Sequence, residues 1–300
     1  MRRIITASTY KREAQMAAKH VFAVVLVAMA TGVGGWLGAA NARAQAPAAQ
    51  PASASTASPA AAAGGTLVEF SNEARFQLDV KVPDAALAAY LPKGWTPNVA
   101  PQGPAKDCNL RVIFIDRVTI NGPDGKPVGK GSNRLVYLAA PVKEPGGTNV
   151  QLIIGGITED PADAPGPFGN YLLATTHDMR RTTTSPTGGA GPIIDTQDWN
   201  FAAAGGERLE MHIKYVRGVA NKGNPNETRF YSAKNPTFFQ ISRQEQVLDI
   251  LRNVTTTPPD RVQEFSFKGS GGSYAKLFDG TEKSLSWDNI LWINRSVLLP

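Results

Sequence analysis

The sequence contains few of the residues that build disulfides and transition-metal sites. Cys108 is the only cysteine in 300 residues, so the chain can form no internal disulfide. The histidines are His20, His177 and His212, and their wide separation argues against a zinc site. We therefore expect no metal and no cofactor. A calcium site formed by the carboxylates of Glu159, Asp160 and Asp163 is the weaker alternative to a solvated loop.

Common catalytic signatures are also missing. The sequence has no G-x-S-x-G motif, which would place a serine nucleophile on a sharp strand-to-helix turn. It has no P-loop and no G-x-G-x-x-G between a strand and a helix. Residues 268–274, KGSGGSY, lie between two predicted strands and favour a hairpin turn. Cys108 follows Lys106 closely, yet a small half-buried residue is favoured over a reactive thiol.

The N-terminus has the pattern of a secretory signal. Residues 1–20 hold five basic residues and one acid, and an apolar run follows at residues 21–33. Ala42-Arg43-Ala44 then supplies the small residues that a signal peptidase accepts. We predict a signal peptide over residues 1–44 and a periplasmic or secreted protein with no membrane span after cleavage. An uncleaved anchor is the alternative, although the run is short for a span.

Loss of this leader would remove most of the excess positive charge. The whole chain carries +6, whereas the residues after 44 hold 25 basic and 24 acidic residues. Such a balance predicts no nucleic-acid partner and no attraction to a membrane surface, because both need a concentrated basic patch. Residues 45–65 contain only Ala, Pro, Ser, Gln, Thr and Gly, which is typical of a disordered linker.

The remaining residues, 66–300, predict one mainly-β domain, either a barrel or a sandwich, with two short helices. Residues 74–82 alternate, with Phe76 and Leu78 on one face and Arg75 and Gln77 on the other. A helix is predicted after Pro83-Asp84 and a second over residues 243–253. Strands are predicted at 74–82, 110–120, 134–142, 148–158, 168–176, 207–218, 228–233, 237–242, 262–267 and 291–299, with loops at 121–131, 158–169 and 182–192.

Two stretches offer candidate site residues. Residues 176–184, THDMRRTTT, combine His177, Asp178 and the pair Arg180-Arg181, and we expect a turn there because no nucleophile is near. In ERLEMHIKYVRG, alternation puts His212 and Lys214 on one strand face. That face is either a charged outer surface or a polar barrel lining, where an amine could have a lowered pKa.

The first half of the domain resembles acetoacetate-decarboxylase-like proteins. The similar features are the strand FQLDVKV, the segment VPDAALAAYLPKGWTPN with its Leu-Pro-x-Gly, and the strands LRVIFIDRV, RLVYLAAPV and NVQLIIGGIT. The resemblance covers about residues 66–180. It implies a cone-like, mostly antiparallel β-barrel around a ligand cavity, and a lysine that forms an imine with a β-keto acid.

The sequence departs from that family at its catalytic lysines. The family's enzymes carry two adjacent lysines, whereas this chain has no Lys-Lys pair, and Arg180-Arg181 is the nearest basic pair. Arginine stays protonated and cannot form an imine. Lys214 is then a weak catalytic candidate, and Arg180, Arg181 and His177 are candidate ligands for a carboxylate.

Three hypotheses follow. The favoured one is a periplasmic barrel that binds a small organic acid or carbonyl compound without imine chemistry. The alternatives are a carboxy-lyase of acetoacetate decarboxylase type with a displaced lysine, and a non-enzymatic envelope interaction protein. The sequence leaves the ligand, the oligomeric state and the identity of any catalytic lysine open.

Overall fold

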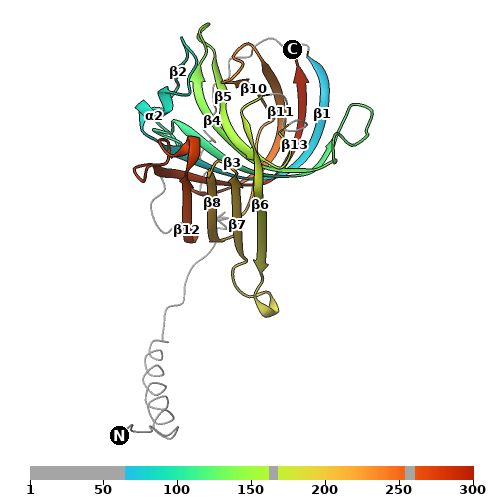
Figure 1. Cartoon of the computed structure of the whole chain (residues 1–300). Helices are drawn as coiled ribbons and strands as arrows, with labels where there is room; N and C mark the ends of the chain where they lie inside the picture. The colour runs from blue at the N-terminus through green and yellow to red at the C-terminus, as the bar shows by residue number, and fades with distance from the viewer. Residues whose placement is uncertain (1–64, 162–167, 254–260) are drawn as a thin grey trace, which may run out of the picture. The chain divides into compact units, whose positions relative to one another are not determined.

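The computed structural model describes residues 65–161, 168–253 and 261–300 (Figure 1). The predicted signal peptide, nearly all of the predicted linker and Asp163 lie outside these residues. The one described α-helix is α2 (Asp84–Ala88), and η2 (Thr187–Gly189) and η3 (Gly272–Tyr274) are short 3₁₀ turns. The strands are β1 (Thr66–Lys81), β2 (Thr96–Pro97), β3 (Leu110–Asn121), β4 (Asn133–Lys143), β5 (Asn149–Thr158), β6 (Tyr171–Thr184), β7 (Ile194–Ala203), β8 (Arg208–Val216), β9 (Asn221–Lys222), β10 (Asn226–Ser232), β11 (Phe239–Arg252), β12 (Val262–Ser270) and β13 (Lys283–Leu299).

Seven of these strands close a barrel. The neighbours follow the order β5, β10, β11, β13, β1, β3 and β4, and β4 pairs with β5 to complete the ring (Figure 1). All the pairs are antiparallel except β10 with β5, which is parallel. The predicted mainly-β, barrel-like domain is therefore confirmed.

A second antiparallel sheet continues from the barrel wall. Its strands are β6, β7, β8 and β12, and β6 joins the barrel through a short parallel pairing of Tyr171–Leu173 with β5. Figure 1 shows these strands below the barrel, with the β6–β7 hairpin extending furthest. Beyond Leu173, β6 leaves the barrel and forms one edge of this sheet.

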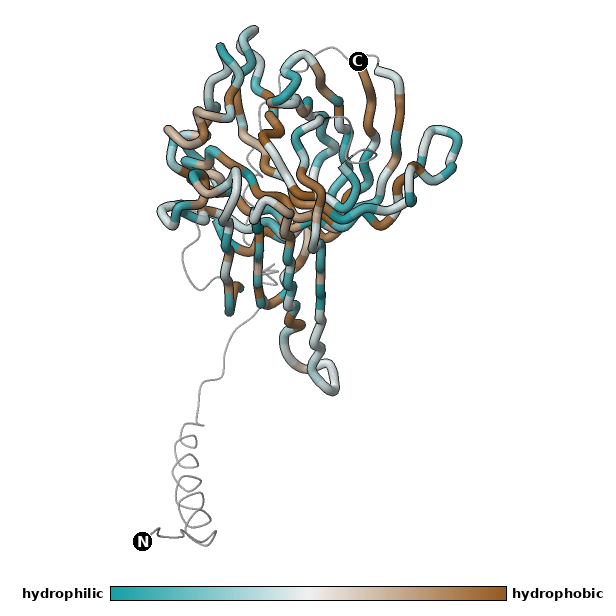
Figure 2. Tube along the Cα trace, viewed as in Figure 1, coloured by the Kyte–Doolittle hydropathy of each residue, from teal (hydrophilic) through white to brown (hydrophobic). Residues whose placement is uncertain are grey.

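The side chains of β1 alternate between two buried regions of the domain, one on each face of the strand. Phe76 and Leu78 face the larger core, where the barrel wall packs on Trp199 and Ile213 of the second sheet. Figure 2 shows hydrophobic residues concentrated along this contact. The other face of β1 looks into the barrel, where a smaller apolar cluster includes Tyr137. Both faces of one strand are thus buried, and the inner one carries Arg75 and Asp79 as well.

Three predictions of local structure were wrong. Residues 243–253 are part of β11, not a helix, because bulges between Val247 and Leu248 and between Ile250 and Arg252 break the two-residue period. Residues 176–184 are not a turn, since β6 continues to Thr184. Strand β7 was missed because its sequence, IDTQDWNFAA, is rich in polar residues. The helix after Pro83 is confirmed, without a side-chain cap.

Candidate functional site

The structure separates the residues of THDMRRTTT instead of gathering them. Successive side chains of β6 point to opposite faces of the sheet. Met179 packs against the large core and Arg181 reaches the buried Asp195, whereas Arg180 is exposed on the other face. Arg180 and Arg181 therefore cannot hold one carboxylate between them in this conformation.

Arg181 belongs to a compact ion cluster inside the second sheet. Its Nη2 lies 2.9 Å from Asp195 Oδ2, and Arg217 Nη2 lies 2.7 Å from the other oxygen. Thr183 also donates a hydrogen bond to Asp195. Burial raises the pKa of the Asp195 carboxyl, but the hydrogen bonds from Arg217, Thr183 and Arg181 outweigh this effect and lower it to about 2. The cluster ties three strands together.

His177 lies apart from both arginines. Its Nε2 is 3.8 Å from Glu159 Oε2, and its backbone oxygen accepts a hydrogen bond of 3.3 Å from Arg134 Nη1. In the loop expected to offer carboxylates to calcium, Glu159 lies beside His177, and Asp163 lies outside the described residues.

Lys214 lies on the outer face of the second sheet. Its Nζ is 2.7 Å from Glu264 Oε1, and the neighbouring His212 Nδ1 is 2.7 Å from Asp198 Oδ1. The hydrogen bond from His212 to Asp198 raises the pKa of this imidazole. No lysine of the described residues is buried. Cys108 is buried, and burial with the nearby charge of Asp79 raises the pKa of its thiol to about 12.

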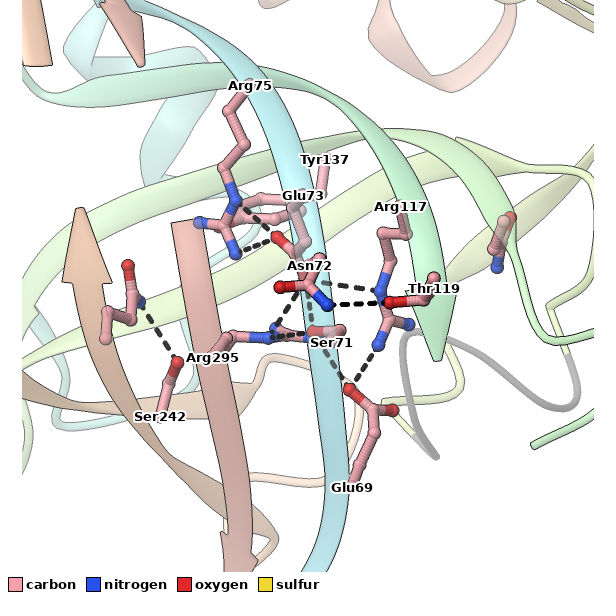
Figure 3. A network of polar contacts seen from close by, with 12 residues as sticks. Glu69, Ser71, Asn72, Glu73, Arg75, Arg117, Thr119, Tyr137, Ser242 and Arg295 are labelled. Atoms are coloured by element: carbon pink, nitrogen blue, oxygen red, sulfur yellow. Dashed lines mark hydrogen bonds and ion pairs between the residues drawn. The ribbon is translucent and has the colours of Figure 1, made fainter. Parts of the chain in front are cut away.

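A buried group of charges inside the barrel is the best candidate site. We call it the arginine–glutamate network and define it as Glu69, Glu73, Arg75, Arg117 and Arg295 (Figure 3). These residues come from β1, β3 and β13, three neighbouring strands of the ring, and each residue as a whole is at most 9% exposed. No sequence pattern identified these residues, because Arg75 alternates with apolar residues just as a solvent-facing residue would.

Glu73 is the centre of this network. Its Oε1 is 3.0 Å from Arg295 Nε and 3.2 Å from Arg117 Nε, and its Oε2 is 2.6 Å from Arg75 Nε. Glu69, which precedes Glu73 on β1, forms ion pairs with both Arg117 and Arg295. Burial raises the pKa of Glu73, yet the three guanidinium groups outweigh it and hold the carboxyl ionised well below its usual range.

The network carries more positive than negative charge. Three guanidinium groups face two carboxylates, all of them buried. Arg117 Nη1 is a buried nitrogen with no hydrogen-bond partner in the described residues. Burial and the charge of Arg295 both lower the pKa of Arg117. A buried cation without a full set of partners is costly, so the arrangement is suited to receiving an anion.

Space for a ligand adjoins the network on one side. A groove of about 670 Å³ is lined by Ser71, Gln244 and Arg295, among others. A second cavity, bordered by Tyr137, Tyr171 and Arg295, has only about 20 Å³ and could hold roughly one water. The barrel interior is thus largely filled by side chains, and the groove is the larger of the two spaces.

A second polar cluster lies further along the same face of β1. Asp79 accepts a hydrogen bond of 2.7 Å from Ser286 and lies 3.3 Å from Arg111. Asp288, on β13, is near this pair. Burial, with the charge of Asp79, raises the pKa of Asp288 to about 7, and Arg111 opposes the shift only in part. This cluster contains a carboxyl that titrates near neutral pH.

Comparisons with known proteins found resemblance in structure but not in sequence. No protein-family model matches the chain, and no curated protein does. A solved acetoacetate decarboxylase-like enzyme from Sphingomonas wittichii RW1 has 11% identity and a TM-score of 0.45, over 79% of this chain and 92% of that one. An acetoacetate decarboxylase from Legionella pneumophila has 10% identity and a TM-score of 0.42, over 79% and 86%.

A third similar structure is the enduracididine biosynthesis enzyme MppR, solved with the condensation product of pyruvate and imidazole 4-carboxaldehyde. It has 10% identity and a TM-score of 0.43, over 79% of this chain and 88% of that one. The sequence suggested a resemblance to acetoacetate-decarboxylase-like proteins, and the structural comparisons confirm that resemblance. With TM-scores below 0.5, the barrel assignment depends on the strand pairing itself.

Proposed function

We propose that this chain is a β-barrel protein that binds a small organic acid through the arginine–glutamate network, without imine chemistry. The single observation that carries the proposal is the buried Arg117 Nη1, which has no partner among the described residues of a cluster with excess positive charge. A ligand carboxylate would supply both the missing acceptor and the missing negative charge.

Arg295 offers a connection between the network and the groove. Its Nη2 is 2.9 Å from Glu69 and its Nε is 3.3 Å from Ser71 Oγ, and both Arg295 and Ser71 line the groove. The groove's volume lies within the range of ordinary small-molecule sites. A carboxylate that enters the groove would meet Arg295 first. Arg117 lies on the far side of Arg295 from the groove, and Glu69 forms ion pairs with both arginines.

Imine formation needs a lysine that is neutral near pH 7, which burial normally provides. The described lysines are all at least partly exposed, and Lys214 is held by Glu264. These placements support binding over a decarboxylase mechanism. Treatment with borohydride in the presence of a β-keto acid, followed by mass spectrometry, would reveal an adduct on any lysine and so refute this part of the proposal.

The binding itself can be measured by isothermal titration with a panel of mono- and dicarboxylic acids. We expect Arg295→Gln to weaken binding by about tenfold or more, because a charge-assisted hydrogen bond is lost. Arg180→Gln is the matched control, since Arg180 is exposed and outside the network. Loss of binding in the Arg180 variant alone would favour the site expected from the sequence and would contradict the network.

We also propose that the protein is exported and cleaved after Ala44, from the basic, apolar and A-x-A pattern of residues 1–44. Among the described residues, none of the helices has the length and hydrophobicity needed to cross a bilayer. Mass spectrometry of the protein recovered from a periplasmic fraction would give the mature N-terminus. An intact leader would instead indicate the uncleaved anchor.

A further inference from the structure

Strand β6 presents a long unpaired edge. It pairs with β7 along most of its length, but with β5 only at Tyr171–Leu173. From residue 174 to Thr184, no strand of the described chain pairs with its other side. Figure 1 shows β6 at one side of the second sheet, with β12 at the other. Exposed edges of this length are ready templates for another strand.

The backbone groups at this edge can be assigned. The carbonyl oxygen of His177 accepts a hydrogen bond from Arg134, so it points away from β7. In an antiparallel pair, alternate residues direct both backbone groups toward the same neighbour. Met179, Arg181 and Thr183 share the parity of His177, and their N–H and C=O groups therefore face the open edge.

The side chains on the outer face of this edge carry opposite charges two residues apart. Asp178 and Arg180 are both exposed, and neither side chain makes a hydrogen bond or ion pair with another described residue. They flank Met179, whose side chain packs on the other face against the core. Such an arrangement is complementary to itself when a second copy of the strand runs in the opposite direction.

We propose that two copies of this chain pair antiparallel through their β6 edges, about a two-fold axis at Met179. Asp178 of each copy then lies opposite Arg180 of the other, which forms two ion pairs on the outer face. The two sheets become one continuous sheet of eight strands built from β6, β7, β8 and β12 of both copies. Cross-strand pairs of opposite charge stabilise such an edge, and like charges oppose it.

Neighbouring registers lack this complementarity. A two-fold axis at Arg181 would place Asp178 opposite Thr184, and the two Arg181 side chains opposite each other. An axis at His177 would place Asp178 opposite Thr176 and Arg180 opposite Ala174. An axis at Arg180 would place the two Arg180 side chains opposite each other, and an axis at Asp178 would do the same with the two Asp178 side chains, so like charges oppose both registers. The charge pattern thus selects the axis at Met179.

Charge reversal provides the test. The molar mass of the purified protein is measured by light scattering after gel filtration, over a range of concentrations. We expect a dimer for the natural sequence and a dissociation constant raised by about tenfold or more for Asp178→Arg or Arg180→Asp alone. The double variant Asp178→Arg/Arg180→Asp restores the opposite charges and should dimerise again. An equimolar mixture of the two single variants should form a mixed dimer.

Asp124→Arg is the control, because it reverses a charge in the β3–β4 hairpin, away from the β6 edge. Circular dichroism of every variant verifies that its strands are retained. A monomer at all concentrations would overturn the proposal. So would a dimer that the single reversals leave unchanged, or a double variant that fails to recover when its fold is intact.

Discussion

Asp288→Asn should stabilise the protein at neutral and alkaline pH. The carboxyl of Asp288 has a pKa raised from 3.8 to about 7, first by burial and then by the charge of Asp79. When the folded pKa of an acid lies above the unfolded one, the unfolded chain releases its proton first as the pH rises. The folded state therefore loses stability between about pH 4 and pH 7, and the penalty is constant above that range.

The size of the effect follows from the shift. Three pKa units correspond to about 4 kcal/mol, since each unit is worth 1.36 kcal/mol. Asparagine has nearly the same shape and cannot ionise, so the variant avoids this penalty. We expect its free energy of unfolding to match the natural protein near pH 4 and to exceed it by up to about 4 kcal/mol at pH 8.

Urea denaturation followed by tryptophan fluorescence at pH 4, 6 and 8 measures this difference. Asp124→Asn is the control, because Lys126 and its backbone N–H lower the pKa of the exposed Asp124. That substitution should not stabilise the protein at pH 8. A difference between the Asp288 variant and the natural protein that stays constant with pH would refute the assignment of the titrating group.

Three further predictions concern buried positions. Glu73→Gln leaves buried guanidinium groups uncompensated, so the free energy of unfolding measured by urea denaturation should fall by about 3–5 kcal/mol. A fall of less than about 1 kcal/mol would mean that water or an ion replaces the carboxylate. Gly156→Ala places a methyl group 2.6 Å from both the Tyr171 ring and the carbonyl oxygen of Val136, so the melting temperature should fall by several degrees, in line with about 1–3 kcal/mol. Cys108 should react with a thiol reagent only after unfolding, because its buried thiol has a pKa of about 12, and rapid labelling of the native protein would contradict this.

The sequence predicted the architecture better than the site. The alternation in β1 identified a strand with two different faces, and Pro83 correctly marked the start of a short helix. Alternation alone cannot reveal that the polar face is also buried, because Arg75 and Asp79 recur with the same period on a solvent-facing strand. The partners that compensate their charges come from β3 and β13, which are distant in sequence.

The errors in β6 and β11 have distinct physical causes. In β11, two bulges change the face of the apolar residues and so imitate the spacing of a helix. In β6, a run of polar residues with no apolar alternation resembles a turn, although pairing with β7 keeps it extended. Strand pairing is a long-range interaction, and local sequence cannot predict it where one edge is open.

Closure of the barrel by β1 and β13 has a consequence for how the chain acquires its fold. The two strands are joined by contacts such as that between Ser71 and Arg295, which are 224 residues apart. During synthesis, β1 is therefore made long before β13, the strand with which it pairs, and the pair can form only when translation is nearly complete. Contacts between such distant residues slow folding, so the chain stays open long enough for chaperones and proteases to act on it. Any truncation that removes residues 283–299 leaves β1 unpaired on one side and removes a guanidinium from the network.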